Sequence, residues 1–139
     1  MRSVPFHPGQ RAEFRRTVTE ADLVNFAGVS GDFNPLHTDA VYAARSRFGQ
    51  RVAHGMLLGA WISALLGTRL PGPGAILLSC GLRFRRPTRV GDTLVVWTEV
   101  ASVREDKPIL HLRVGCTNQE GETVVEGEAA CLWEPVEEG

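Results

Sequence analysis

The sequence predicts an α+β fold in which a curved antiparallel sheet wraps around one long central helix. Residues 53–70 are apolar nearly all round and contain no Asp or Glu, so they are expected to form a helix enclosed by the protein. Four segments with alternating apolar residues follow, separated by turn residues. The 139 residues show no repeat or linker and are expected to form a single domain, residues 1–139.

A strand and a short helix are expected before the long helix. Residues 10–18 alternate weakly and are expected to form the first strand. Thr19 followed by Glu20-Ala21-Asp22 is typical of a helix start, because acidic residues are favourable near the positive end of the helix dipole. A further helical turn is expected at residues 42–47.

The long helix is expected to end at Pro71-Gly72-Pro73-Gly74. Alternation then predicts a meander of strands at residues 76–84, 94–100, 110–116 and 125–133, with turns at 91–92, 106–108 and 120–121. One such sheet leaves an open edge, and Val95 with Trp97 adds apolar side chains on its second face. We therefore expect a homodimer with two sheets joined edge to edge.

The composition argues against several classes of protein. The net charge of −1, without a basic run, argues against a nucleic-acid partner. No segment is long enough to span a membrane, and residues 1–10 lack the apolar core of a signal peptide. Cys80, Cys116 and Cys131 have no disulfide or zinc spacing, and no nucleotide-cofactor motif is present. We therefore expect a soluble cytoplasmic protein without a membrane partner.

The candidate catalytic residues lie in the stretch Ser30-Gly31-Asp32-Phe33-Asn34-Pro35-Leu36-His37. Gly31 permits a turn with positive φ, and Pro35 favours an extended residue before it. Asp32 and His37 are therefore expected on a stiff, bent loop rather than on a helical face, where they could share a water. The alternative is turn chemistry alone, with Asp32 or Asn34 capping backbone amides.

The segment from Phe26 to His37, with Ala43 six residues beyond, resembles the hydratase-2 motif of the MaoC-like family, the (R)-specific enoyl-CoA hydratases. The pattern is most similar to the short hydratases that feed polyhydroxyalkanoate synthesis. The likeness covers nearly the whole chain, since it continues at residues 53–58, 86–92, 104–108 and 127–129. It implies the hotdog fold.

The resemblance implies the reversible hydration of a trans-2-enoyl-CoA to the (3R)-hydroxyacyl-CoA, with no cofactor and no metal. Asp32 and His37 would form the catalytic dyad and add water to one face of the double bond. We prefer Asp32 as the base, although the sequence does not divide the two roles. Asn34 would hold the loop or the water by hydrogen bonds.

Other residues are expected to complete the site. The N–H of Gly55, at the start of the long helix, would stabilise the thioester oxyanion, unless this glycine only fits the helix against a crowded sheet. Ser63 lies two helical turns further on and would contact the dyad and the acyl chain, or would bond back to its own helix. Leu66 and Cys131 would line the end of the acyl tunnel, and Leu66 would close it, with core packing as its alternative. By the resemblance, a tunnel closed there favours chains of about four to six carbons.

The remaining polar residues are assigned by environment. His54 is expected to be structural, and His7 and His111 are expected on the surface. A cluster of arginines at one strand end would bind the phosphates of coenzyme A, or would form a solvated face: Arg83, Arg85, Arg86 and Arg89.

Three other functions remain open. The first is a MaoC-like hydratase of a branched or dicarboxylic acyl-CoA, and the second is a catalytically silent acyl-CoA-binding module. The third is a hotdog thioesterase, which the absence of a carboxylate in residues 53–70 argues against.

Overall fold

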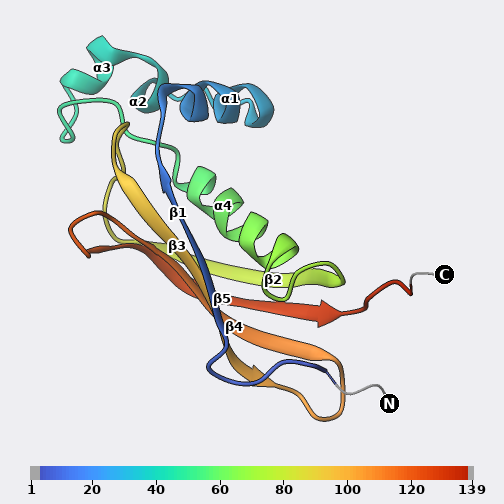
Figure 1. Ribbon diagram of the computed structural model, residues 1–139. Helices are drawn as coiled ribbons and strands as arrows, with labels where there is room; N and C mark the ends of the chain where they lie inside the picture. Colours follow the sequence, from blue (N-terminus) through green and yellow to red (C-terminus); the bar gives the residue numbers. More distant parts are fainter. Residues whose placement is uncertain (1–3, 138–139) are drawn as a thin grey trace.

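The computed structural model describes residues 4–137 and has the predicted α+β class. Figure 1 shows α4 along one face of a curved sheet, the hotdog arrangement, with the shorter helices grouped beyond one end of that sheet. The strands are β1 (Arg11–Thr17), β2 (Ala75–Phe84), β3 (Thr93–Val103), β4 (Ile109–Thr117) and β5 (Thr123–Trp133). The helices are α1 (Glu20–Ser30), α2 (Pro35–Thr38), α3 (Ala40–Ala44) and α4 (Gly55–Thr68). No helix within residues 4–137 is long and apolar enough to cross a membrane.

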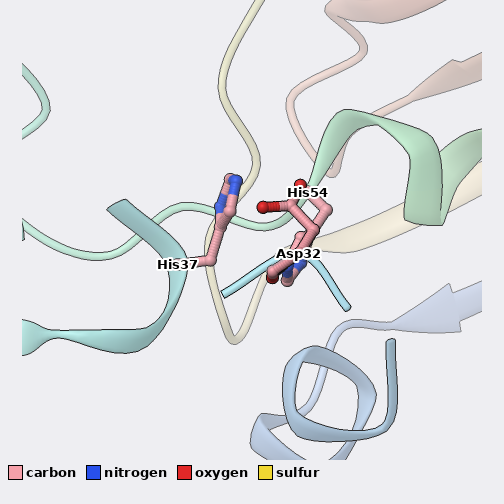
Figure 2. Close-up of side chains that lie close together, drawn as sticks. All are labelled: Asp32, His37 and His54. Carbon is pink, nitrogen blue, oxygen red and sulfur yellow. Dashed lines mark hydrogen bonds between the residues drawn. The ribbon is translucent and has the colours of Figure 1, made fainter. Parts of the chain in front are cut away.

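The short helices carry the candidate dyad, with Asp32 on the loop after α1 and His37 on α2 (Figure 2). Thr19 caps α1 as predicted, in a reciprocal pair with Asp22: each accepts a hydrogen bond from the other's backbone N–H. The predicted turn at residues 42–47 begins earlier instead. It starts after Asp39, whose carboxylate accepts hydrogen bonds from the N–H groups of Val41 and Tyr42 and so caps α3.

The sheet order is β1-β3-β4-β5-β2, so the predicted meander holds only for β3, β4 and β5. The prediction was wrong for β2, which pairs antiparallel with β5 at the far edge of the sheet. Gly91 and Asp92 therefore do not close a hairpin between β2 and β3. Their backbone groups pair with Val18 instead, at 2.9 and 2.8 Å, and extend the contact between β1 and β3.

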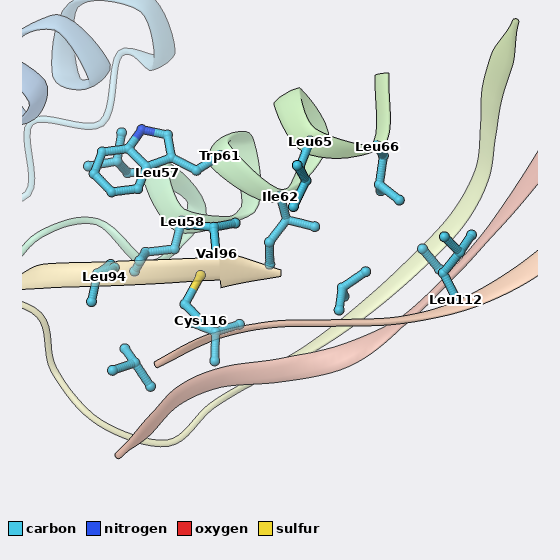
Figure 3. Close-up of a cluster of buried hydrophobic side chains, with 14 of the residues drawn as sticks. Leu57, Leu58, Trp61, Ile62, Leu65, Leu66, Leu94, Val96, Leu112 and Cys116 are labelled. Atoms are coloured by element: carbon cyan, nitrogen blue, oxygen red, sulfur yellow. The ribbon is translucent and has the colours of Figure 1, made fainter. Parts of the chain in front are cut away.

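One face of α4 packs against the concave side of the sheet and forms the core (Figure 3). The opposite face is uncovered, and Met56 is 60% exposed there beside the exposed Ala60 and Ser63. The prediction that the protein encloses the helix on every side is therefore wrong for a single chain. The core side chains of α4 are Leu57, Leu58, Trp61, Ile62, Leu65 and Leu66.

The two edges of the sheet differ in character. β1 presents Arg11, Glu13, Arg15 and Arg16, and charge of this kind prevents edge-to-edge pairing. β2 instead exposes four large apolar side chains, each between 44% and 51% exposed: Ile76, Leu77, Leu78 and Phe84.

Val95 and Trp97 on β3 do not form the exposed apolar face that the sequence predicted. Both are half-buried, and the Arg11 guanidinium lies 4.7 Å from the centre of the Trp97 ring. The uncovered apolar surface of the sheet therefore lies at β2.

Candidate active site

Asp32 lies on the predicted turn, but His37 does not lie on a loop. Gly31 ends α1 with φ 75°, as expected for a glycine that reverses the chain. Pro35 then occupies the first turn of α2, where its missing N–H costs nothing, and His37 follows on this helical turn. The prediction of a non-helical setting was therefore wrong for His37. Proline interrupts a helix when it lies in the interior, but it is favourable in the first turn, where Pro35 lies.

Asn34 holds the turn together. Its side-chain oxygen accepts a hydrogen bond from the Leu36 N–H at 2.9 Å and so caps α2. Its own N–H donates to the Asp32 carboxylate at 3.1 Å. Asn34 thus links the turn that carries Asp32 to the helix that carries His37. It both caps α2 and holds the loop.

The orientation of the His37 ring is set by the segment before α4. Its Nδ1 lies 2.7 Å from the carbonyl oxygen of Val52. A carbonyl can only accept, so Nδ1 carries a proton that it donates to Val52, and Nε2 is the ring nitrogen left for the site. The Val52 N–H in turn donates to the Leu36 carbonyl at 3.1 Å.

Arg51 also fixes this segment, although nothing in the sequence singles it out. Its guanidinium forms a two-point ion pair with Glu20 of α1, at 2.8 and 2.6 Å, and donates to the His37 carbonyl at 3.4 Å. The pair with Arg51 holds the pKa of the Glu20 carboxyl below its usual value.

Asp32, His37 and His54 come together in space (Figure 2). One carboxylate oxygen and one ring nitrogen from each histidine lie within 4.8 Å of one another. Two hydrogen bonds of about 2.8 Å that meet at the tetrahedral angle of one water span about 4.6 Å. The spacing therefore suits a single water held between the carboxylate and an imidazole.

The same three residues do not suit a metal ion. The rings of His37 and His54 are stacked, with centroids 3.9 Å apart and planes 26° from parallel. Stacked imidazoles direct their in-plane lone pairs side by side, whereas a bound metal needs lone pairs that converge on one point. The arrangement therefore favours acid–base chemistry at this position.

A cavity of about 540 Å³ opens beside Asp32, at the junction of α4 with the end of β2. His37 lines a separate hollow of about 240 Å³, so the dyad stands between two recesses. Asp32 is exposed and His37 is half-buried, which leaves the pair accessible to solvent in a single chain. The lining of the larger cavity includes Asp32, His54, Gly55, Met56, Phe84 and Thr88.

Gly55 begins α4 at the wall of this cavity. The residue before it, His54, provides no side-chain cap, and within residues 4–137 no group accepts a hydrogen bond from the N–H of Gly55 or Met56. A Cβ at position 55 would lie 2.8 Å from the Phe84 ring. Both expectations for Gly55 are thus compatible with the structure: a free helix N–H, and a crowded contact with the sheet.

The structure does not bring the predicted acyl-contacting residues to this cavity. Ser63 is exposed on the uncovered face of α4 rather than buried. Leu66 and Cys131 are 3% and 0% exposed within the core, and burial raises the pKa of the Cys131 thiol to about 11. None of the three lines the cavity beside Asp32, and their contact with an acyl chain stays a prediction.

The predicted coenzyme A-binding arginines are engaged in ion pairs on the outer surface. Arg85 and Arg86 line the cavity, whereas Arg83 does not. Such exposed pairs contribute little to stability and can be exchanged for a phosphate, so the assignment stays a prediction. The pairs are Arg83 with Glu128 at 3.3 Å, Arg85 with Glu126 at 2.8 Å and Arg86 with Glu122 at 3.0 Å.

The other two histidines lie on the surface, as the sequence predicted. His7 and His111 are exposed. The three cysteines are all unpaired, and burial raises the pKa of the Cys116 thiol to about 12, which excludes it as a thiolate nucleophile near neutral pH.

The chain is similar to known proteins of one family. The family model described as "MaoC like domain" matches residues 5–121. The chain is 44% identical over 124 residues to the (R)-specific enoyl-CoA hydratase of Rhodospirillum rubrum, covering 89% of this chain and 85% of that protein. It is 45% identical over 116 residues to the 3-hydroxybutyryl-CoA dehydratase of Methylorubrum extorquens, covering 83% and 73%. The solved structure of the (R)-hydratase from Aeromonas caviae involved in PHA biosynthesis superposes with a TM-score of 0.90 at 40% identity, covering 94% of this chain and 99% of that one.

Proposed function

The chain belongs to the MaoC-like family, and from this premise we propose that it catalyses the (R)-specific hydration of a trans-2-enoyl-CoA to the (3R)-hydroxyacyl-CoA, and the reverse dehydration. The observation that carries the proposal is the Asp32 carboxylate beside the His37 imidazole, at a distance that suits one shared water. The similarity to the 3-hydroxybutyryl-CoA dehydratase supports a short acyl chain.

The proposed reaction divides between the two residues of the dyad. Asp32 takes a proton from the water as the water oxygen bonds to Cβ, and His37, which enters this step with a proton on both ring nitrogens, delivers the Nε2 proton to Cα. Because Nδ1 is occupied by the Val52 carbonyl, Nε2 is the ring nitrogen available for this transfer. The proton held by Asp32 then passes through the next water to Nε2 of His37, so both groups return to their starting state and the reaction as written uses no cofactor. Both groups act from one side, so water adds to a single face of the double bond.

We place the oxyanion donor at the first N–H of α4. Charge gathers on the thioester oxygen as water adds, and an N–H at a helix N-terminus can stabilise it with the helix dipole behind. The N–H of Gly55 is free within the described chain, and a glycine lets the substrate approach closely.

Crotonyl-CoA separates this function from its alternatives in one assay. The absorbance of the enoyl thioester is followed with and without a thiol reagent. Hydration removes the conjugated band without releasing coenzyme A, hydrolysis releases a thiol, and a silent binding module changes neither signal. Rapid oxidation of the product by an enzyme specific for the (3S) isomer would contradict the (R) assignment.

We also propose that the active form is a homodimer joined along β2. The support is the row of exposed apolar side chains on the β2 edge, the uncovered face of α4 and the position of Phe84, which belongs to this edge and also lines the cavity. A second copy there would cover all three. We further propose a cytoplasmic location, which the unpaired cysteines support.

Light scattering tests the dimer at low micromolar concentration. The parent is expected at about twice the chain mass of 15.2 kDa, and Leu78→Lys is expected to give monomers with reduced activity. Val29→Lys makes the same exchange at an exposed position of α1 and should stay dimeric. A fully active monomeric parent would exclude the proposal.

A further inference from the structure

His54 contacts every part of the proposed catalytic apparatus. Its side chain is 1% exposed, and its Nε2 lies 2.9 Å from the backbone carbonyl of Asp32. Its ring is stacked on that of His37. Its own carbonyl accepts the Leu57 N–H at 3.1 Å, which closes the first turn of α4 and so fixes Gly55. One residue thus joins the base, the acid and the oxyanion donor of the proposed reaction.

The hydrogen bond to Asp32 defines the state of the His54 ring. The Asp32 carbonyl can only accept, so the proton sits on Nε2 of His54 and Nδ1 carries a lone pair. That Nδ1 is buried and has no partner within residues 4–137. A leucine of similar size at this position would leave no polar atom to satisfy. The Nε2–H is therefore the polar group of this ring that holds the turn carrying Asp32.

We propose that His54 is the positioning residue of the dyad, and that its Nε2–H···O=C bond to Asp32 sets the distance between the Asp32 carboxylate and the His37 ring. The inference rests on the proposed function. Asp32 lies on an exposed turn, so its carboxylate needs an anchor in the protein interior to stay within reach of the shared water. Because the His37 ring stacks on the His54 ring, His54 also fixes the position of His37.

Two variants separate the hydrogen bond from the shape of the ring. In His54→Gln the side-chain amide can donate from nearly the position of Nε2, but the ring is lost. In His54→Phe a ring of similar size remains, but the donor is lost. Ile62→Val is a core control, because it removes one buried methyl group without touching the site. Each variant is assayed with crotonyl-CoA for kcat and KM, and its melting temperature is measured.

We expect His54→Phe to lower kcat by about 10–100-fold with little change in KM, because a misplaced catalytic group affects the transition state more than binding. The kcat of His54→Gln should be at least about fivefold higher than that of His54→Phe, even if His54→Gln has the lower melting temperature. Ile62→Val should keep kcat within about twofold of the parent.

Two results would overturn the inference: a His54→Phe enzyme within about twofold of the parent in kcat, or a His54→Gln enzyme no better than His54→Phe. If His54→Phe does not fold, His54→Leu takes its place and the same comparison with His54→Gln applies. Asp32→Asn is run alongside. If it keeps full activity, the dyad itself is wrong; if it is inactive while His54→Phe is unaffected, only the role of His54 is wrong.

Discussion

Gly55→Ala tests whether the start of α4 serves the reaction or only fits against the sheet. The new methyl group would lie 2.8 and 2.9 Å from two atoms of the Phe84 ring. That ring is 50% exposed on an edge strand, so it can move aside. Replacing glycine by alanine within a helix is worth up to about 1 kcal/mol of stability, and this gain opposes the cost of the displaced ring. The melting temperature is therefore expected to change little.

The effect on activity should be much larger if the Gly55 N–H faces the thioester oxygen. Loss of one oxyanion donor lowers kcat by about 10²–10³-fold, and a methyl group that obstructs the approach should cost at least about 10-fold. The matched control is Gly59→Ala, one turn along the same helix, where the methyl group would meet Leu82 at 3.3 Å. Steady-state assays with crotonyl-CoA and thermal unfolding of both variants give the comparison.

Two outcomes would refute this reasoning. One is a Gly55→Ala enzyme with kcat within about twofold of the parent. The other is recovery of activity in Gly55→Ala combined with Phe84→Ala, measured against Phe84→Ala alone. Recovery would mean that the displaced ring, rather than the obstructed N–H, had caused the loss.

Three further predictions concern the dyad, Leu66 and Asp22. Asp32→Asn and His37→Ala should each lose about 10²–10⁴-fold in hydratase activity while keeping the circular dichroism spectrum of the parent, and near-normal turnover would exclude the dyad. Leu66→Ala should lower the free energy of unfolding by about 2–5 kcal/mol because Leu66 is buried in the core. A higher kcat/KM for octenoyl-CoA relative to crotonyl-CoA in this variant would identify it as the tunnel stop. The ionised Asp22 carboxylate should stabilise the protein above pH 3.8, the ordinary pKa of an aspartate side chain. Burial alone would raise the pKa of this carboxyl, but hydrogen bonds from Thr19 and the charge of Arg16 outweigh it and hold the pKa low. The stability that Asp22 contributes is fully present above the pKa of this carboxyl in the unfolded chain. It is lost as the pH falls through the lower pKa of the folded protein. Asp22→Asn should therefore be less stable by about 1–3 kcal/mol at pH 7 in urea unfolding, with a difference that shrinks below pH 3.8.

The sequence predicted local features better than long-range ones. The cap at Thr19 and the turn at Gly31 follow from neighbouring residues, and the structure confirms both. The place of β2 could not be predicted, because alternation marks a strand but does not say which strand it pairs with. A helix that is apolar on every side needs to be covered, but its sequence does not distinguish cover by its own chain from cover by a second copy.

The candidate site shows the same limit. The Asp32–His37 pairing follows from a short motif. The anchoring of that motif by Arg51, Val52 and His54 depends on contacts across the fold, and a lone arginine or histidine gives no signal of such a contact.

The position of β2 in the sheet also bears on how the chain comes off the ribosome. β2 is synthesised before β3, β4 and β5, yet its neighbour in the finished sheet is β5. Until the last strand emerges, a ten-residue segment rich in leucine and isoleucine has no partner within its own chain. Exposed strands of this kind are where nascent proteins aggregate or recruit chaperones. The edge at which we propose that two copies join is therefore open to a neighbouring nascent chain before either domain is complete.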